Sequence, residues 1–286
     1  MSLSLFRSVL ALTFQRAYFV DLLTSFITDA KFARWEFEEY VSPLVEGESE
    51  ALARDHATQA VELAHALAFR NGLGKSLFAP AHSNLTVEDV KAYAATAFSK
   101  GNVAVIGTGI SQETLSSLVD KAFAKAAEGT AASSPASAYY GGETRVASHA
   151  GPQTVFVGFG TTGANSAELA ALAAHLSPST IKWSKGLSPL AELPEETSVQ
   201  PVYLPYTDAT LFGLLVQGST AEGVKAAATK AVAALKQSAQ GLKAEEVKSA
   251  VAKAKFAAAA ASETREGLVS TLGSKVGFDP FALCIM

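Results

Sequence analysis

The chain has 286 residues, of which 49% are hydrophobic and 17% are charged, and its formal net charge is −4. This length and composition allow two domains with buried cores and exclude an intrinsically disordered chain. The acidic balance argues against nucleic acid as a partner, because nucleic-acid-binding proteins present a basic face. The one cysteine, Cys284, excludes an internal disulfide and indicates a reducing compartment. No stretch approaches 18 uncharged apolar residues, so no membrane span is predicted.

The first part of the chain is predicted to be helical. Residues 1–20 contain Arg7 and Arg16 and no acid, which is typical of a mitochondrial transit peptide, although an ordinary amphipathic start to a domain explains them equally well. Helices are expected over 18–31 and 32–41. Ser42 is then predicted to cap a new helix with Pro43 at its first position. That helix is expected to run from Leu44 to about Phe69 and to end at Gly72 and Gly74.

A helix, a strand and a further helix are predicted next. Thr86 and Asp89 form an approximate capping box for the helix. The strand covers 103–106, a short apolar run between glycines, and Ser111 caps a helix to about residue 126. Residues 128–142 are rich in Ala, Ser and Gly without periodicity, which is typical of a linker.

The second half repeats this order. We predict strands over 143–148, 154–159, 202–204 and 209–217. A helix opened by Asn165 and Glu168 is expected to end near residue 176, and a long loop is expected over 177–197. Two helices are predicted after the last strand: one that runs to about residue 238 with Ser219 and Glu222 as its capping box, and one over 244–266. The lysines of the last two helices are interpreted as a solvated face. The pattern predicts an α+β fold with two related domains, each a mainly antiparallel sheet covered by helices. The first domain covers 1–127, the linker 128–142 and the second domain 143–286.

One glycine motif has the spacing of a dinucleotide site. Residues 158–163 read Gly-Phe-Gly-Thr-Thr-Gly, after a predicted strand and before a predicted helix. Such a site also needs a second parallel strand that ends in an acidic residue about 20 positions on. A polar loop follows here instead, so we interpret these glycines as positions of close packing, and no cofactor is expected.

The histidines do not have the spacing of a metal site. The five are His56, His65, His82, His149 and His175, and none forms a His-x-x-Glu-His or His-Glu-x-x-His pattern. His56 and His65 lie nine residues apart on one predicted helix, on opposite faces. No Ser-His-Asp or Cys-His arrangement is indicated either. We therefore predict no catalytic, cofactor-binding or metal-binding residues.

Several segments resemble a known superfamily. They include Lys31-Phe32-Ala33-Arg34-Trp35-Glu36-Phe37, the stretch 83–91, the stretch 101–109, Gly151-Pro152-Gln153-Thr154-Val155-Phe156-Val157 and the loop 181–190. Together they resemble the zinc metallopeptidase superfamily of the mitochondrial processing peptidases and the core proteins of the cytochrome bc1 complex. The loop 181–190 and residues 206–213 look like core protein 2 rather than a processing peptidase. The resemblance covers about residues 17–277.

This resemblance implies a processing-peptidase-like fold and a non-catalytic core subunit of complex III in the respiratory chain, peripheral on the matrix side of the mitochondrial inner membrane. The implied partners are a core protein 1 homologue, cytochrome b, cytochrome c1 and other subunits of the complex, in a hetero-oligomer. The alternative is a zinc endopeptidase of the processing-peptidase type. Glu39 and Glu46 fall near the two glutamates that such peptidases carry after the metal helix, but the histidines are missing.

Members of this superfamily extend further at both ends. The first strands and the metal helix, or its degenerate equivalent, would precede residue 17, and a last strand and helix would follow residue 277. The chain therefore resembles a fragment or the product of an altered gene model. We expect low stability in isolation, because a truncated sheet leaves unpaired edges and apolar helix faces in water.

Overall fold

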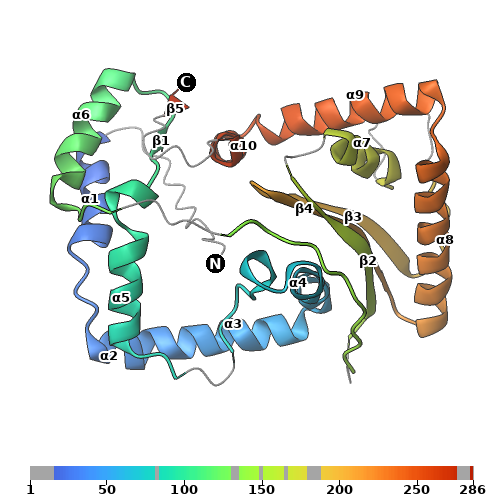
Figure 1. Cartoon of the computed structure of the whole chain (residues 1–286), viewed down its shortest axis with the longest axis horizontal. Coiled ribbons are helices and arrows are strands. Elements are labelled where there is room, and N and C mark those ends of the chain that lie inside the picture. Colours follow the sequence, from blue (N-terminus) through green and yellow to red (C-terminus); the bar gives the residue numbers. More distant parts are fainter. Residues whose placement is uncertain are drawn as a thin grey trace. The chain divides into compact units, whose positions relative to one another are not determined.

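The computed structural model describes residues 16–80, 84–129, 135–147, 151–163, 167–178, 188–275 and 284–285 (Figure 1). By their contacts, these residues form two compact units that alternate along the sequence. The first unit holds residues from 47–81 and 134–258, and the second holds residues from 5–46, 82–133 and 259–286. The division at 128–142 predicted from the sequence stays a prediction.

A three-stranded antiparallel sheet forms the centre of the first unit. Its strands are β2 (Gln153–Thr162), β3 (Thr197–Pro205) and β4 (Ala209–Gly218), in the order β2-β4-β3. Phe212 of the middle strand faces Phe159 on one side and Tyr203 on the other. Eight consecutive residues of β4 are buried, from Ala209 to Val216. An antiparallel strand that is buried at consecutive positions, rather than at alternate ones, must have both of its faces covered.

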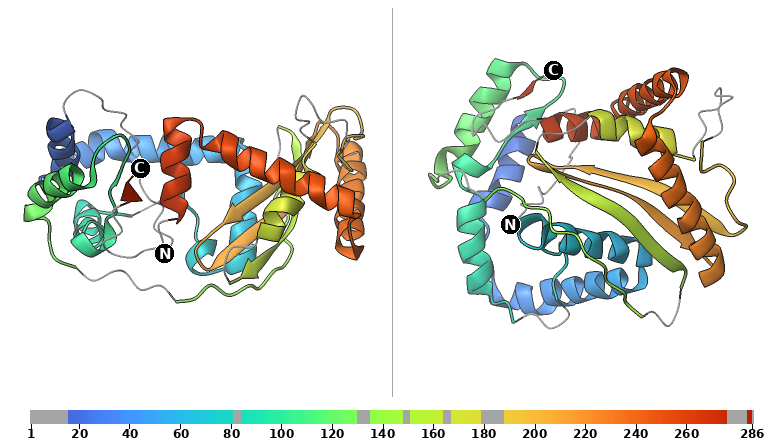
Figure 2. Two further views of the ribbon diagram at one scale, coloured as in Figure 1. Left: turned by 90° about the horizontal axis from the view of Figure 1, so that it is seen from above. Right: turned by 45° about the vertical axis from the view of Figure 1, so that its right-hand side comes forward.

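Helices cover the two faces of this sheet (Figure 2). The helices α7 (Ala167–Leu176) and α8 (Ala221–Gln240) pack on one face, where Phe212, Leu214 and Val216 form a core cluster with their side chains. The helix α4 (His56–Phe69) packs on the other face, where Ala68 and Phe69 meet Ala209 and Leu211. Each fully buried apolar side chain contributes about 1.5–3 kcal/mol. This arrangement confirms the α+β class.

The predicted long helix over 44–69 is wrong, because the structure contains two helices there. The helix α3 (Ser42–Arg54) ends just before Asp55, whose carboxylate accepts hydrogen bonds from the backbone N–H groups of Ala57 and Thr58 and caps α4. An acidic side chain that satisfies the free N–H groups of a helix end favours a new start at that point.

The predicted break at Ser42 is also wrong. Ser42 has helical backbone angles, and its N–H donates to the carbonyl of Phe37 across a π-helical turn (η1, Phe37–Val41) that follows the short helix α2 (Arg34–Glu36). The chain therefore passes from α2 into α3 without a cap. A π turn widens the helix locally, and here it lies directly before Pro43, whose ring crowds the preceding turn of a regular helix.

Two later helices differ from prediction by a few residues, α8 (Ala221–Gln240) in its capping residue and the next helix in its last residue. Thr220, not Ser219, caps α8: its side-chain oxygen accepts from the N–H of Gly223. The helix α9 (Ala244–Ala261) stops before residue 266, and α10 (Arg265–Lys275) begins after Thr264, whose hydroxyl oxygen accepts from the N–H of Gly267. Hydroxyl side chains thus set both boundaries.

The second unit contains α1 (Arg16–Thr28), α5 (Val87–Ala97), α6 (Gln112–Ala122) and α10. The capping box of α5 is confirmed, with Thr86 and Asp89 bonded reciprocally. The predicted strand 103–106 is reduced to β1 (Ile106–Gly107), which pairs in parallel with β5 (Cys284–Ile285). Short 3-10 turns occur over Gly72–Gly74, Lys100–Asn102 and Phe123–Lys125.

Two further expectations concern the segments around the sheet. Residues 143–147 form no strand, contrary to prediction. Asn165, expected to open α7, lies outside the described residues, as do His82 and His149. Among the described helices, none combines the length and the apolar character that a crossing of a bilayer requires.

Candidate functional site

His65 is the most buried histidine of the described residues, and both of its ring nitrogens have partners. The Nδ1 atom lies 2.7 Å from the carbonyl oxygen of Val61, and the Nε2 atom lies 2.6 Å from the hydroxyl of Tyr206. A carbonyl oxygen only accepts, so Nδ1 carries the proton, and Nε2 accepts from the Tyr206 hydroxyl. Burial raises the pKa of Tyr206, and the charge of Glu62 raises it further. The pair is a structural contact with no free nitrogen for a metal.

His56, at the other end of α4, also has a backbone partner. Its Nδ1 atom lies 2.9 Å from the carbonyl oxygen of Pro152. His175 lies on α7, where burial lowers its pKa and the charge of Glu246 raises it less. These three histidines therefore lie at separate places in the first unit.

The described residues do not fit the zinc site that the alternative, a processing-peptidase-type endopeptidase, requires. Zinc sites take three or four His, Cys or carboxylate ligands on one centre. Within the described part of the chain, no group of three or more His, Cys, Asp or Glu side chains is arranged to hold a metal ion. Glu39 and Glu46 are exposed on η1 and α3.

The glycine motif is part of the sheet. Gly158 and Gly160 lie inside β2, which runs on to Thr162. A Cβ atom on Gly158 would come within 2.3 Å of the carbonyl oxygen of Phe212, and one on Gly160 within 2.7 Å of the Tyr139 ring. In the described residues β2 pairs only with β4, and that pairing is antiparallel. This geometry supports the packing interpretation, since a dinucleotide site needs two parallel strands.

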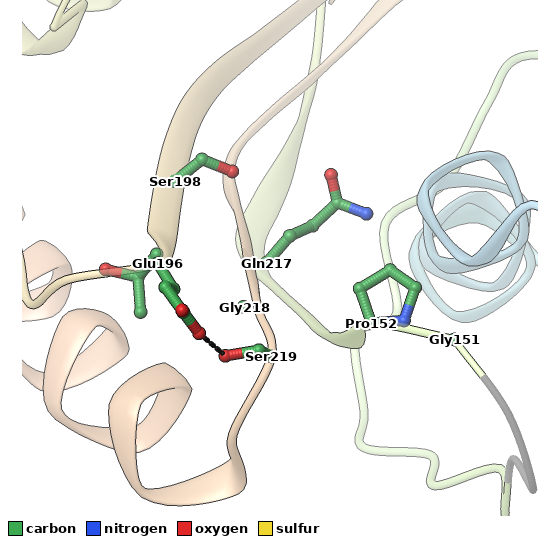
Figure 3. Close-up of a pocket in the computed structure, with 8 residues that line it drawn as sticks. Gly151, Pro152, Glu196, Ser198, Gln217, Gly218 and Ser219 are labelled. Atoms are coloured by element: carbon green, nitrogen blue, oxygen red, sulfur yellow. Dashed lines mark hydrogen bonds between the residues drawn. The ribbon is translucent and has the colours of Figure 1, made fainter.

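A shallow polar hollow lies where β2 and β3 begin and β4 ends (Figure 3). Its lining includes one carboxylate, Glu196, which accepts a hydrogen bond of 2.5 Å from the hydroxyl of Ser219. Gln217 donates from its side chain to the Thr154 hydroxyl at 3.3 Å. Acid–base hydrolysis uses a carboxylate together with a second acid, a base or a metal. No second titratable side chain lines this hollow, and no sequence signal pointed to it.

Both units expose large apolar side chains. In the second unit Trp35 and Tyr40 form an edge-to-face pair with ring centroids 6.1 Å apart and remain 56% and 66% exposed. In the first unit the Arg70 guanidinium lies 4.5 Å from the centre of the Tyr140 ring, which is half exposed. Other exposed apolar residues include Tyr18, Phe26, Leu44, Leu77, Val155, Val247 and Phe256. Exposed aromatic and aliphatic groups of this size are typical of surfaces that other proteins cover.

The fold is similar to that of a chain in a solved structure of complex III. The chain superposes with a TM-score of 0.78 on a chain of the solved structure "Complex III2 from Candida albicans, Inz-5 bound", over 94% of this chain and 68% of that chain, at 15% sequence identity. At this identity the likeness shows the fold alone. No family model matches the chain.

The sequence itself leads to particular relatives. It is 40% identical over 266 residues to "Cytochrome b-c1 complex subunit 2, mitochondrial" of Cryptococcus neoformans, covering 90% of this chain and 61% of the relative. It is 36% identical over 274 residues to the protein of the same name from Yarrowia lipolytica, covering 91% and 63%. The chain is therefore a relative of cytochrome b-c1 complex subunit 2, which confirms the resemblance seen in the sequence. It spans about three fifths of the length of these relatives.

Proposed function

We propose that this chain acts as a core subunit of the mitochondrial cytochrome b-c1 complex, complex III of the respiratory chain. The observation that carries the proposal is the 40% identity to subunit 2 over nine tenths of the chain. The likeness in fold to a chain of complex III supports it. The proposed partners are a core protein 1 homologue, cytochrome b and cytochrome c1, and the proposed position is peripheral, on the matrix side of the inner membrane.

The proposed role is structural and not catalytic. Both ring nitrogens of His65 are bonded to protein groups, and the Glu196 carboxylate is bonded to Ser219. Exposed aromatic residues such as Trp35 and Tyr40 suit a protein whose role is contact with other subunits. We also propose the two-domain, processing-peptidase-like organisation, with domains over 1–127 and 143–286 and no metal, cofactor or catalytic residues.

Affinity purification from mitochondria tests this function. The tagged full chain should be recovered with cytochrome b and the core protein 1 homologue and should migrate with complex III on a native gel. Recovery with a processing-peptidase β subunit instead would overturn the proposal. Hydrolysis of a presequence peptide by the purified chain, abolished by a chelator, would overturn the non-catalytic role.

A nucleotide test addresses the glycine motif separately. Because Gly158 and Gly160 lie inside the strand β2 and not at a turn before a helix, NAD and FAD should leave the thermal midpoint of the chain unchanged. A ligand that binds only the folded state raises that midpoint, so a concentration-dependent rise would contradict the packing role of these glycines.

A further inference from the structure

The two outer edges of the sheet differ in their chemistry. β3 carries Pro201 and Pro205, four residues apart and therefore on the same edge of the strand. Proline has no N–H, and in strands it occurs where the missing donor faces away from the ladder. The outer edge of β3 thus lacks two donors, which hinders the addition of another strand. β2 contains no proline between Gln153 and Thr162.

The outer edge of β2 has no strand partner in the described residues. All ten of its residues pair with β4, and no backbone hydrogen bond of β2 to any other described segment accompanies that ladder. Such an edge presents alternate N–H and C=O groups that a further extended chain can bond. The open edge of the sheet is therefore β2.

An apolar groove lies beside the start of this edge, between the first three residues of β2 and the helix α8. Its floor includes Val155 of β2, which is 38% exposed, and Val224, Ala228 and Val232 of α8. A strand paired with β2 would lie about 4.8 Å from it and would direct every second side chain toward α8. Those side chains would enter the groove, so apolar residues at alternate positions would fit it.

The groove is also positively charged. Lys225 and Lys236 of α8 line it and are exposed, and no Asp or Glu is among its lining residues. Within the part of the chain that the structure describes, neither ammonium group forms an ion pair. The two lysines are about three helical turns apart, roughly 16 Å, which lies between the spans of four and six strand residues, about 13 and 20 Å, the separations that place two side chains on one face. A segment with an acidic residue at each end matches this charge pattern.

We propose that the outer edge of β2 and the groove beneath α8 bind an extended segment of another polypeptide. This segment adds to the sheet as a fourth strand, directs alternate apolar side chains into the groove and pairs an acidic residue at each end with Lys225 and Lys236. A second copy of this chain fits less well. Its β2 has no acidic residue, and its own lysines would approach those of the first copy. The inference stands apart from assembly into complex III.

The test uses the full chain and a synthetic peptide, Glu-Thr-Val-Thr-Val-Thr-Glu, whose acids and valines share one face. Fluorescence anisotropy should detect binding. A peptide with Lys at both ends should bind about tenfold more weakly, and one with prolines at its fourth and fifth positions should not bind, because at least one proline meets the paired edge. Hydrogen exchange should show peptide-dependent protection of β2 amides and none of β3.

Charge reversal in the chain provides the matched control. The double variant Lys225→Glu and Lys236→Glu should prefer the Lys-ended peptide, whereas Lys248→Glu, on the exposed surface of α9, should bind like the unaltered chain. If the double variant misfolds, the three peptides on the unaltered chain decide the question.

Three outcomes would overturn the proposal. They are no binding of the acid-ended peptide, equal binding of the proline peptide, and protection outside β2. Concentration-dependent protection of β2 without peptide would make a second copy the occupant and would overturn it as well. None of these results bears on co-purification with complex III, so failure here and failure of the proposed function are distinguishable.

Discussion

The Nε2 atom of His65 and the hydroxyl oxygen of Tyr206 lie 2.6 Å apart and join α4 to the connection between β3 and β4. The two residues are 141 positions apart in the sequence. Their hydrogen bond lies next to the Phe69 ring, whose centroid is 6.4 Å from that of His65. It therefore fixes the helix on the sheet face at which Phe69 enters the core.

Removing this hydroxyl should destabilise the first unit. In Tyr206→Phe the Nε2 atom of His65 loses its donor in a largely buried place, which costs about 1–2 kcal/mol of unfolding free energy. Urea denaturation followed by circular dichroism measures the change. Tyr93→Phe, at an exposed position of α5, is the control and should change stability by less than about 0.5 kcal/mol. Equal stability of the two variants would contradict the role of the hydrogen bond.

The cap of α4 should contribute stability that depends on pH. The side-chain hydrogen bond from Thr58 is the largest influence on Asp55 and lowers its pKa, and burial opposes it. A carboxyl whose pKa is lower in the folded state stabilises that state above its unfolded pKa, and this contribution is lost as the pH falls through the folded pKa. Asp55→Ala should cost about 1 kcal/mol at pH 7. The difference from the unaltered chain should shrink on acidification below the ordinary carboxyl range, measured by denaturation at several pH values. A constant difference across that range would contradict this account.

A pair of glycine substitutions should give opposite effects. Gly158→Ala introduces a Cβ atom within 2.3 Å of the Phe212 carbonyl oxygen, so it should destabilise the sheet by about 1–3 kcal/mol. Gly47→Ala, inside α3 with no atom within 4 Å of its Cβ position apart from its chain neighbours and the backbone of its own helix, should stabilise the chain by about 0.5–1 kcal/mol. Thermal unfolding of both variants checks this. A tolerated alanine at Gly158 would show that β2 and β4 are not packed as described.

The isolated chain should aggregate or be degraded when it is expressed without partners. Trp35, Tyr40 and Leu44 are more than half exposed. Exposed apolar surface of this kind favours association. Size-exclusion chromatography and light scattering measure it. A monomer with a sharp, reversible melting transition would contradict the prediction.

The elements that could be predicted from the sequence are those stabilised by residues close together in the chain. Thr86 and Asp89 are three residues apart, so their reciprocal capping bonds are predictable from the sequence. The strand β4 and the helix α8 were predictable as well, because a short continuous apolar run and a helical repeat of apolar residues are each visible within the element. The resemblance to core subunits rested on such segments and needed no structure.

Other features of the fold depend on contacts between residues that are far apart in the sequence, and these could not be predicted. The division at Asp55 was missed because the apolar pattern continues through it, and the cap acts only if the chain turns there. No signal near His65 indicates Tyr206, and none near Phe69 indicates Leu211, since the pairing of α4 with the sheet depends on contacts more than 140 residues apart. The open edge of β2 likewise emerges only from strand order.

The sequence by itself determined the class of elements, the missing metal motif and the relatives of this chain. Tertiary packing decided which faces are covered and which remain open, because burial depends on what lies on both sides of each strand.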